Sequence, residues 1–156
     1  MKKLPVRFII VKHLFFIVVF VTLSRCLFAE TILEGNVTKI RDGDTIEVGQ
    51  IAIRFQGLTC DELNTKKGRE AHDLLNEILM GKRVVCELSG EMSYERLVGR
   101  CAVSEKGDIA RYLIENGYCG RCNRYDKKGF YAESEKKSGP YLSLIHISEP
   151  TRQLCI

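Results

Sequence analysis

The residues most suggestive of chemistry are two acids that flank a glycine, Asp42 and Asp44, directly before a segment of alternating apolar and polar residues. Asp and Gly are frequent in tight turns, and a turn alone would account for both carboxylates. Two like charges side by side are unfavourable unless a positive charge lies nearby, and Ca²⁺ prefers carboxylate oxygens as ligands. The pattern leaves two interpretations open, a plain turn or a site for a divalent cation.

The segment after these acids reads as a β-hairpin. Residues 45–48 and 51–55 alternate, and the Gly-Gln pair between them suits a two-residue turn. Counting outward from that turn pairs Thr45 with Arg54 and places the apolar side chains on one face. Asp44 and Arg54 then share one end of the hairpin, so a carboxylate and a guanidinium are expected to lie close together.

The remaining periodicities predict a small fold that is mainly β with helices (α+β). Strands of this length with helices between them fit a five-stranded OB-type barrel with three helices. Apolar residues at helical spacing, with Gly after the first two helices and Asp before the second, mark the helices. The other strands are expected at residues 31–40, 83–88 and 97–103, and the helices at about 71–80, 109–116 and 127–137.

The first 29 residues have the layout of a secretory signal peptide. A basic start is followed by an apolar run at residues 14–23, which is short for a membrane span, and Ala29 precedes the expected cleavage point. The sequence therefore predicts export to the periplasm or outside the cell. An uncleaved signal would leave the protein anchored in the membrane.

The C-terminal residues resemble something other than natural protein sequence. Residues 142–152 read LSLIHISEPTR, which resembles the translation of a sequencing adapter. We therefore expect residues 141–156 to be an artefactual tail. The folded domain is expected at residues 30–140, in a truncated form.

The cysteines indicate disulfides, because the chain has seven of them and is predicted to be exported. Cys86 and Cys101 lie on strands expected to be neighbours, which makes them candidates for a cross-strand bridge. Cys119 and Cys122 form a CxxC pair, for which a structural disulfide is favoured over a zinc site. The formal net charge of +4 permits a polyanionic partner without requiring one.

Five segments together resemble a known family: DGDTIEV, IRFQGLTCDE, GREAHDLL, SYERLVGRC and GDIARYLIENGYC. They follow the order found in staphylococcal nuclease and its thermonuclease-like relatives, from Val37 to about Lys137. The resemblance implies an OB barrel with three helices and Ca²⁺-dependent hydrolysis of phosphodiester bonds in DNA and RNA. It implies a monomer with no stable protein partner.

The resemblance also assigns residues. It makes Asp44 the metal-binding aspartate, with Asp42 nearby, and it makes Arg54, Glu62 and Arg96 the catalytic residues. These types suit the reaction, because guanidinium groups match phosphate oxygens in pairs and a glutamate can take a proton from the attacking water.

Two positions depart from the family pattern. The family loop D-x-P-E is here Thr59-Cys60-Asp61-Glu62, so one metal carboxylate is missing, and Asp61 is the candidate replacement in a site expected to bind Ca²⁺ weakly. Glu95 stands where the family has glycine, which adds negative charge and excludes any backbone conformation that only glycine reaches easily. A non-catalytic nucleic-acid-binding OB module, or an OB domain that binds oligosaccharide or protein, stays open as an alternative.

Aromatic residues near the predicted site are candidates for base stacking. Tyr94 precedes the second arginine and Tyr125 follows the second helix, and aromatic side chains stack on bases in OB-type sites. Packing within the protein explains either residue equally well. Arg100 also follows a glycine, but the Tyr-x-Arg pattern favours Arg96 as the second arginine.

Overall fold

The computed structural model describes residues 31–141. Its longer strands begin and end close to where the alternation of apolar residues predicts them, except that the strand expected at residues 83–88 continues to Ser93. Two of them, β2 and β3, have the predicted bounds. The strands are β1 (Thr31–Asp42), β2 (Thr45–Val48), β3 (Ile51–Phe55), β5 (Arg83–Ser93) and β6 (Arg96–Val103).

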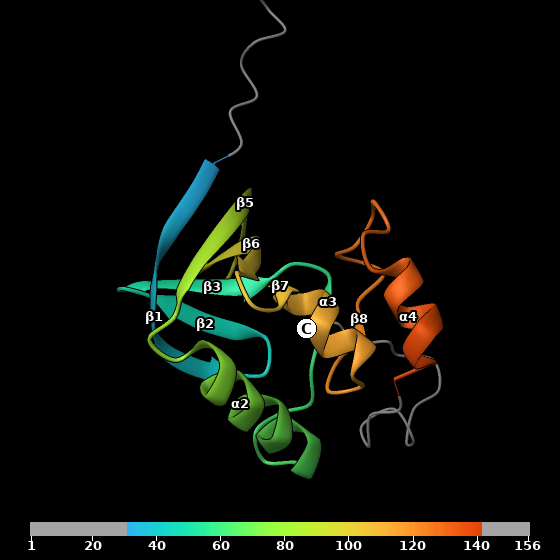
Figure 1. The fold of residues 1–156 in the computed structure, drawn as a ribbon. Helices are drawn as coiled ribbons and strands as arrows, with labels where there is room; N and C mark the ends of the chain where they lie inside the picture. The colour runs from blue at the N-terminus through green and yellow to red at the C-terminus, as the bar shows by residue number, and fades with distance from the viewer. Residues whose placement is uncertain (1–30, 142–156) are drawn as a thin grey trace, which may run out of the picture. The chain divides into compact units, whose positions relative to one another are not determined.

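These five strands close into a ring. The sheet order is β3-β2-β1-β5-β6, and β3 also pairs in parallel with β6, which joins the two ends. A short strand, β7 (Gly107–Asp108), extends the sheet beyond β6. The described part of the chain is therefore α+β with the predicted five-stranded OB-type barrel (Figure 1).

The β2–β3 hairpin has the predicted register. Thr45 faces Arg54 and Val48 faces Ile51. Ile46 and Ile53 are opposite each other and fully buried in the barrel. Because Arg54 faces Thr45, the first residue of β2, it lies at the end of the hairpin next to the Asp-Gly-Asp turn.

The helix expected at residues 109–116 matches its predicted position, whereas the helix expected at about 71–80 begins earlier, at Lys66. Helix α2 (Lys66–Leu79) begins after Thr65, whose side-chain oxygen accepts a hydrogen bond from the Gly68 amide at 3.0 Å. Helix α3 (Ile109–Glu115) begins after Asp108, whose carboxylate accepts from the Arg111 amide at 2.8 Å. Figure 1 shows α2 at one end of the strands and α3 between the strands and the last helix.

The third helix, α4 (Ala132–Ser138), begins later than expected. The preceding residues form turns around the buried carboxylate of Asp126, which accepts hydrogen bonds from the amides of Phe130 and Tyr131. Those amides bond to a side chain instead of to a helical carbonyl, so a helix cannot start at residue 127.

The disulfides confirm one expectation and correct another. Cys86 and Cys101 are directly opposite on β5 and β6 and are bonded, as predicted. Cys119 pairs with Cys60 and not with Cys122, so the expected CxxC bridge is wrong. The partner comes from a distant segment because β4 (Leu58–Thr59) and β8 (Gly120–Arg121) pair as a small second sheet, which brings these segments together.

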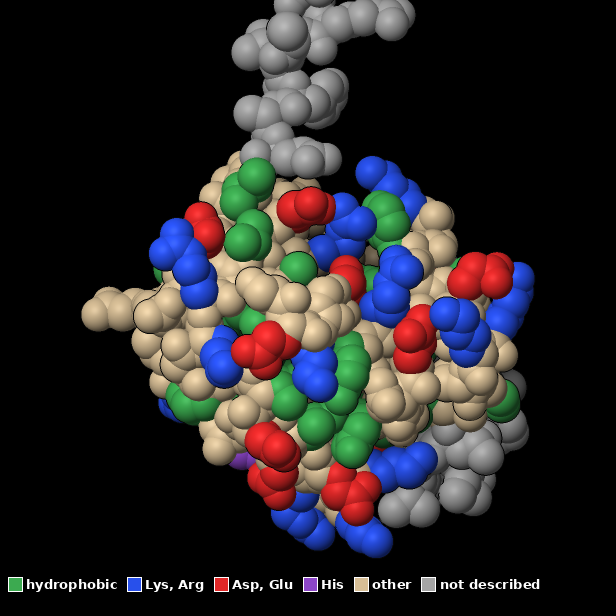
Figure 2. All heavy atoms as spheres, in the orientation of Figure 1, with side chains coloured by type: hydrophobic (Ala, Val, Ile, Leu, Met, Phe, Trp, Pro, Cys, Tyr) green, Lys and Arg blue, Asp and Glu red, His purple; other side chains and the backbone are tan. Residues whose placement is uncertain are grey.

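The predicted signal peptide (residues 1–29) and the predicted artefactual tail lie outside the described residues, apart from Tyr141 at the start of that tail. No helix among residues 31–141 is long and apolar enough to cross a membrane. On the face seen in Figure 2, acidic and basic side chains are interspersed, as the mild net charge leads one to expect.

Candidate active site

The centre of the site is an ion pair between Asp44 and Arg54. The guanidinium donates from Nη1 to Asp44 Oδ1 at 2.9 Å and from Nη2 to Asp44 Oδ2 at 2.8 Å. Both residues are buried, with exposed fractions of 7% and 8%. A fork that holds both oxygens of one carboxylate fits a phosphate group equally well, because phosphate offers oxygens at similar spacing.

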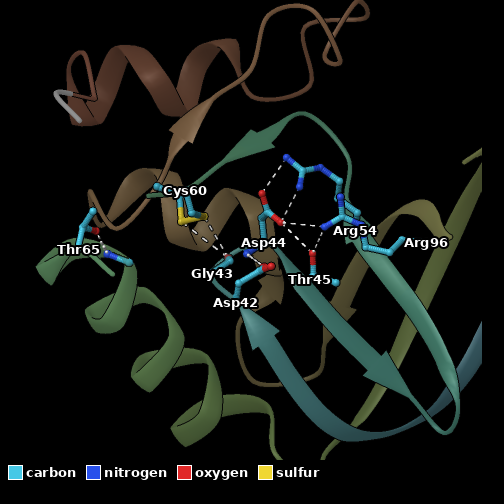
Figure 3. Close-up of a disulfide and its surroundings, with 10 residues drawn as sticks. Asp42, Gly43, Asp44, Thr45, Arg54, Cys60, Thr65 and Arg96 are labelled. Atoms are coloured by element: carbon cyan, nitrogen blue, oxygen red, sulfur yellow. Dashed lines mark hydrogen bonds and ion pairs between the residues drawn. A yellow bond between two sulfur atoms is a disulfide. The ribbon is translucent and has the colours of Figure 1, made fainter. Parts of the chain in front are cut away.

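Arg96 comes to the same place from β6. Its Nη1 donates to Thr45 Oγ1 at 2.9 Å and lies 4.0 Å from Asp44 Oδ1. Figure 3 shows the Arg54 and Arg96 side chains converging on Asp44. The parallel pairing of β3 with β6 is what brings the two arginines together, since it sets Arg54 opposite Val98.

Thr45 is the site residue that the sequence reasoning missed. Its fully buried hydroxyl donates to Asp44 Oδ1 at 2.9 Å and accepts from Arg96, so it connects the two. The signal was present in the sequence, because Thr45 follows Asp44 directly and faces Arg54 in the predicted register.

Arg100, the competing candidate for the second arginine, lies elsewhere. It forms an ion pair with Glu87 on β5, and its guanidinium carbon is 4.0 Å from the centre of the Phe130 ring. The structure therefore places Arg96, and not Arg100, beside Arg54.

The electrostatics of Asp44 are dominated by burial. The pKa of this carboxyl group is raised to about 7, chiefly by removal from water; the charge of Arg54 opposes the rise and the neighbouring Asp42 adds to it. Asp42 is half-buried, and its Oδ1 accepts from the Asp44 amide at 3.0 Å, which fixes the turn. The effects of burial and of Asp42 on the pKa of Asp44 together exceed the opposing effect of Arg54. An additional positive charge near Asp44 would therefore stabilise its ionised form.

The loop that follows β4 carries the other predicted residues. Glu62 is exposed, and its backbone carbonyl accepts from the Thr65 amide at 2.9 Å, which sets the loop at the start of α2. Asp61 is buried beside Tyr141, and its charge adds to the burial that raises the pKa of that phenol. Asp61 Oδ2 has no hydrogen-bond partner among the described residues.

Tyr94 and Tyr125 line one cleft of about 340 Å³ together with Arg54. Arg124 and Met92 also line this cleft. Tyr94 is 79% exposed and Tyr125 is 39% exposed, so both rings are accessible to a ligand. The arrangement sets two aromatic rings beside a buried arginine, which suits bases stacked on either side of a bound phosphate.

The turn between β5 and β6 contains Tyr94 and Glu95, and its backbone shows which of the two has a left-handed conformation. Tyr94 has a φ of 56°, and it is the only non-glycine residue with positive φ in the described chain. The left-handed conformation thus falls on Tyr94, and Glu95 has no backbone conformation of the kind that favours glycine, as expected for a glutamate. Glu95 is exposed, and its remaining effect is its charge.

The residues present fit a weakly held cation. Asp44 and Asp42 supply carboxylate oxygens, and Ca²⁺ accepts water and phosphate oxygens for its remaining positions. Within residues 31–141, no group of three or more His, Cys, Asp or Glu side chains could hold a metal by itself. A divalent cation here would need oxygens from water or substrate in addition to those of the protein.

Fold and site together define a class: a small OB-type barrel in which an acidic turn and two arginines form a site for an anionic group. The sequence comparisons agree with this class. A family model described as staphylococcal nuclease homologue matches residues 52–138. The chain therefore belongs to the staphylococcal nuclease family. The match begins after the Asp-Gly-Asp turn, so the metal-binding role of Asp42 and Asp44 stays a prediction from the sequence resemblance.

The curated relatives are distant. The succinoglycan biosynthesis protein ExoI of Rhizobium meliloti (strain 1021) is 29% identical over 106 residues, which cover 61% of this chain and 55% of the relative. An uncharacterized endonuclease of Escherichia coli O157:H7 is 25% identical over 89 residues, covering 54% of this chain and 58% of the relative. The chain thus spans little more than half the length of these relatives.

Proposed function

We propose that the chain is an exported, Ca²⁺-dependent nuclease that hydrolyses phosphodiester bonds of DNA and RNA. The observation that carries the proposal is the convergence of Arg54 and Arg96 on Asp44. A module that only bound nucleic acid would need basic and aromatic residues, but it would gain nothing from a buried carboxylate facing an anionic substrate.

The protein residues divide the work as follows. Arg54 and Arg96 bind oxygens of the scissile phosphate and stabilise the charge that builds up there in the transition state. Glu62, exposed on the neighbouring loop, takes the proton from the attacking water. The water oxygen bonds to phosphorus and the P–O bond to the leaving group breaks. The leaving alkoxide takes a proton from solvent, so the products are an alcohol and a phosphate monoester.

Asp44, with Asp42, is the proposed ligand of Ca²⁺. Bound there, the cation would neutralise charge on the phosphate oxygens. Arg54 holds both oxygens of Asp44 in this structure, and with substrate present the same fork can turn to the phosphate. Asp61 is the third proposed ligand. Its burial beside Tyr141 means that it would act only if the loop shifts.

Export and a monomeric state are part of the proposal. Disulfides persist in oxidising compartments, and the two bridges in the described residues support export through the predicted signal peptide. Arg54, Arg96 and Asp44 all come from one chain, so the site needs no second copy.

Digestion of plasmid DNA and of RNA tests the proposal, with Ca²⁺ and then with a chelator. We expect both substrates to be cleaved with Ca²⁺ and neither with chelator. Binding of nucleic acid without cleavage in either condition would overturn the proposal in favour of a non-catalytic OB module. Thr59, which replaces a family carboxylate, and Glu95, which replaces a family glycine, are the features that favour that alternative.

A further inference from the structure

The Cys60–Cys119 disulfide packs against the backbone of the acidic turn. We propose that this disulfide positions the catalytic site, holding the Asp42-Gly43-Asp44 turn and the Glu62 loop so that the nuclease works fully only with the bond oxidised. The inference rests on the proposed function. Cys60 and Cys119 act through other residues and are positioning residues.

Both sulfur atoms lie against the carbonyl oxygen of Gly43. Cys60 Sγ is 3.0 Å from that oxygen and Cys119 Sγ is 3.8 Å from it (Figure 3). Neither sulfur carries a proton in the disulfide, so these are packing contacts and not hydrogen bonds. Gly43 lies between the two proposed metal ligands, and the bridge therefore touches the centre of the turn.

The glycine itself shows how close this packing is. A Cβ atom on Gly43 would lie 2.8 Å from Cys60 Cβ, 3.1 Å from Cys60 Sγ and 3.0 Å from the Cβ of Ala71 on α2. Side-chain carbons do not approach so closely, so the backbone of the turn is held between the disulfide and the helix. We therefore expect a change in the bridge to shift the backbone that carries Asp42 and Asp44.

On its other side the bridge holds the loop of the proposed general base. Cys60 follows Thr59, which pairs with Gly120, the residue after Cys119. The paired segments β4 and β8 have two residues each, so few backbone hydrogen bonds hold them together. The disulfide is the covalent link at this point, and it joins the loop of Glu62 to the acidic turn through the contact with Gly43.

The second disulfide provides a matched control. Cys86 and Cys101 are directly opposite in the long β5–β6 ladder, where backbone pairing on both sides already holds the strands. All its atoms lie within one hairpin. Removing it should lower stability without moving the acidic turn.

The bond can be opened by a dithiol reductant. Cys119 is buried but Cys60 is half-buried, so a thiolate reaches Cys60 Sγ and displaces the Cys119 thiolate. The second thiol of the reductant then releases the Cys60 thiol. The protein gains two electrons and two protons, and the reductant leaves as its own disulfide.

The experiment compares wild type with two double variants, Cys60→Ala/Cys119→Ala and Cys86→Ala/Cys101→Ala. Three quantities are measured below the unfolding temperature: kcat and KM for DNA cleavage, Ca²⁺ affinity by calorimetry, and hydrogen exchange of the backbone amides of residues 42–45. We expect the first variant to lose about a hundredfold in kcat, as a small misplacement of catalytic groups does. Its Ca²⁺ affinity should fall and exchange at the turn should accelerate. In the second variant, kcat, Ca²⁺ affinity and exchange at the turn should match wild type.

Reduction provides the test if the first variant does not fold. Because Cys122 is also disulfide-bonded, a Cys86→Ala/Cys101→Ala/Cys122→Ala protein, in which Cys60–Cys119 is the bond under test, is treated with dithiothreitol and then reoxidised, with the same readouts. Loss of kcat that returns on reoxidation supports the inference, and unchanged kcat and unchanged exchange at the turn overturn it. If oxidised wild type does not cleave DNA at all, the proposed function fails, while the exchange of residues 42–45 still decides whether the disulfide positions the turn.

Discussion

Arg54 and Arg96 approach the same carboxylate from two different strands, and this is the contact from which the chemistry follows. We predict that Arg54→Lys and Arg96→Lys each lower kcat about a hundredfold to a thousandfold, because a lysine cannot present a planar fork to phosphate. Steady-state cleavage of a short DNA substrate measures the effect.

Arg100→Lys is the matched control for that pair of substitutions. Arg100 is on the same strand as Arg96 but pairs with Glu87 and lies over Phe130. Its substitution should leave kcat near the wild-type value. A large loss of kcat in Arg100→Lys, with Arg96→Lys unaffected, would show that the wrong arginine has been assigned.

The buried carboxyl group of Asp44 should make stability depend on pH. Its pKa is about 7 in the folded state, whereas Asp in an unfolded chain has a pKa of about 4. Between these values the folded state binds the extra proton, so the free energy of unfolding falls as the pH rises, by at most about 1.4 kcal/mol per pH unit.

Asp44→Asn removes that titration. We expect the stability of the variant relative to wild type to be highest at about pH 8 and to decrease toward pH 4, as wild-type Asp44 becomes protonated first in the folded and then in the unfolded state. Urea unfolding without Ca²⁺ at several pH values measures it. A difference that does not change with pH would mean that Asp44 is ionised throughout this range.

At the scale of elements, the β5–β6 hairpin combines strain with exposure. Tyr94 has a left-handed backbone conformation, which costs a non-glycine residue about 1–2 kcal/mol, yet most of its ring is exposed. Strain at an exposed aromatic residue that lines the cleft is consistent with a role in binding.

Tyr94→Asn tests that role. Asparagine tolerates positive φ, so stability should stay equal or rise slightly, while loss of the ring should raise KM for DNA about tenfold through lost stacking. Tyr94→Phe keeps the ring and should keep KM near wild type. Thermal unfolding and steady-state kinetics of both variants test these expectations. An unchanged KM in Tyr94→Asn would show that Tyr94 has no role in binding DNA.

At the scale of the whole molecule, the two disulfides should differ in their contribution to stability. Cys60 and Cys119 are 59 residues apart in sequence, and Cys86 and Cys101 are 15 apart. In the chain-entropy description the longer loop gives about 1 kcal/mol more stabilisation. Urea unfolding of the two double alanine variants should show the larger loss for Cys60→Ala/Cys119→Ala. Equal losses would mean that loop entropy is not the main term.

Much of this protein follows from its sequence alone, wherever the determining interactions are local. The β2–β3 register is set by a two-residue turn and a side-chain period of two, so Asp44 and Arg54 are predicted to be neighbours, and they are. Helix α3 begins after Asp108 because this side chain caps the amide of Arg111, as the sequence predicts. The Cys86–Cys101 bridge follows because both residues lie on strands of one antiparallel hairpin.

Only the tertiary structure decided the features that depend on how the ring closes. The β3–β6 pairing brings Arg96 to Thr45 across 51 residues of sequence, and the β4–β8 pairing selects Cys60 as the partner of Cys119. A tight turn and the alternation of side chains determine which nearby residues pair. A long-range contact depends on which distant strands become neighbours in the barrel, and packing of the whole core determines that. The packing of the Cys60–Cys119 disulfide against the acidic turn is such a contact, and no local sequence pattern predicts it.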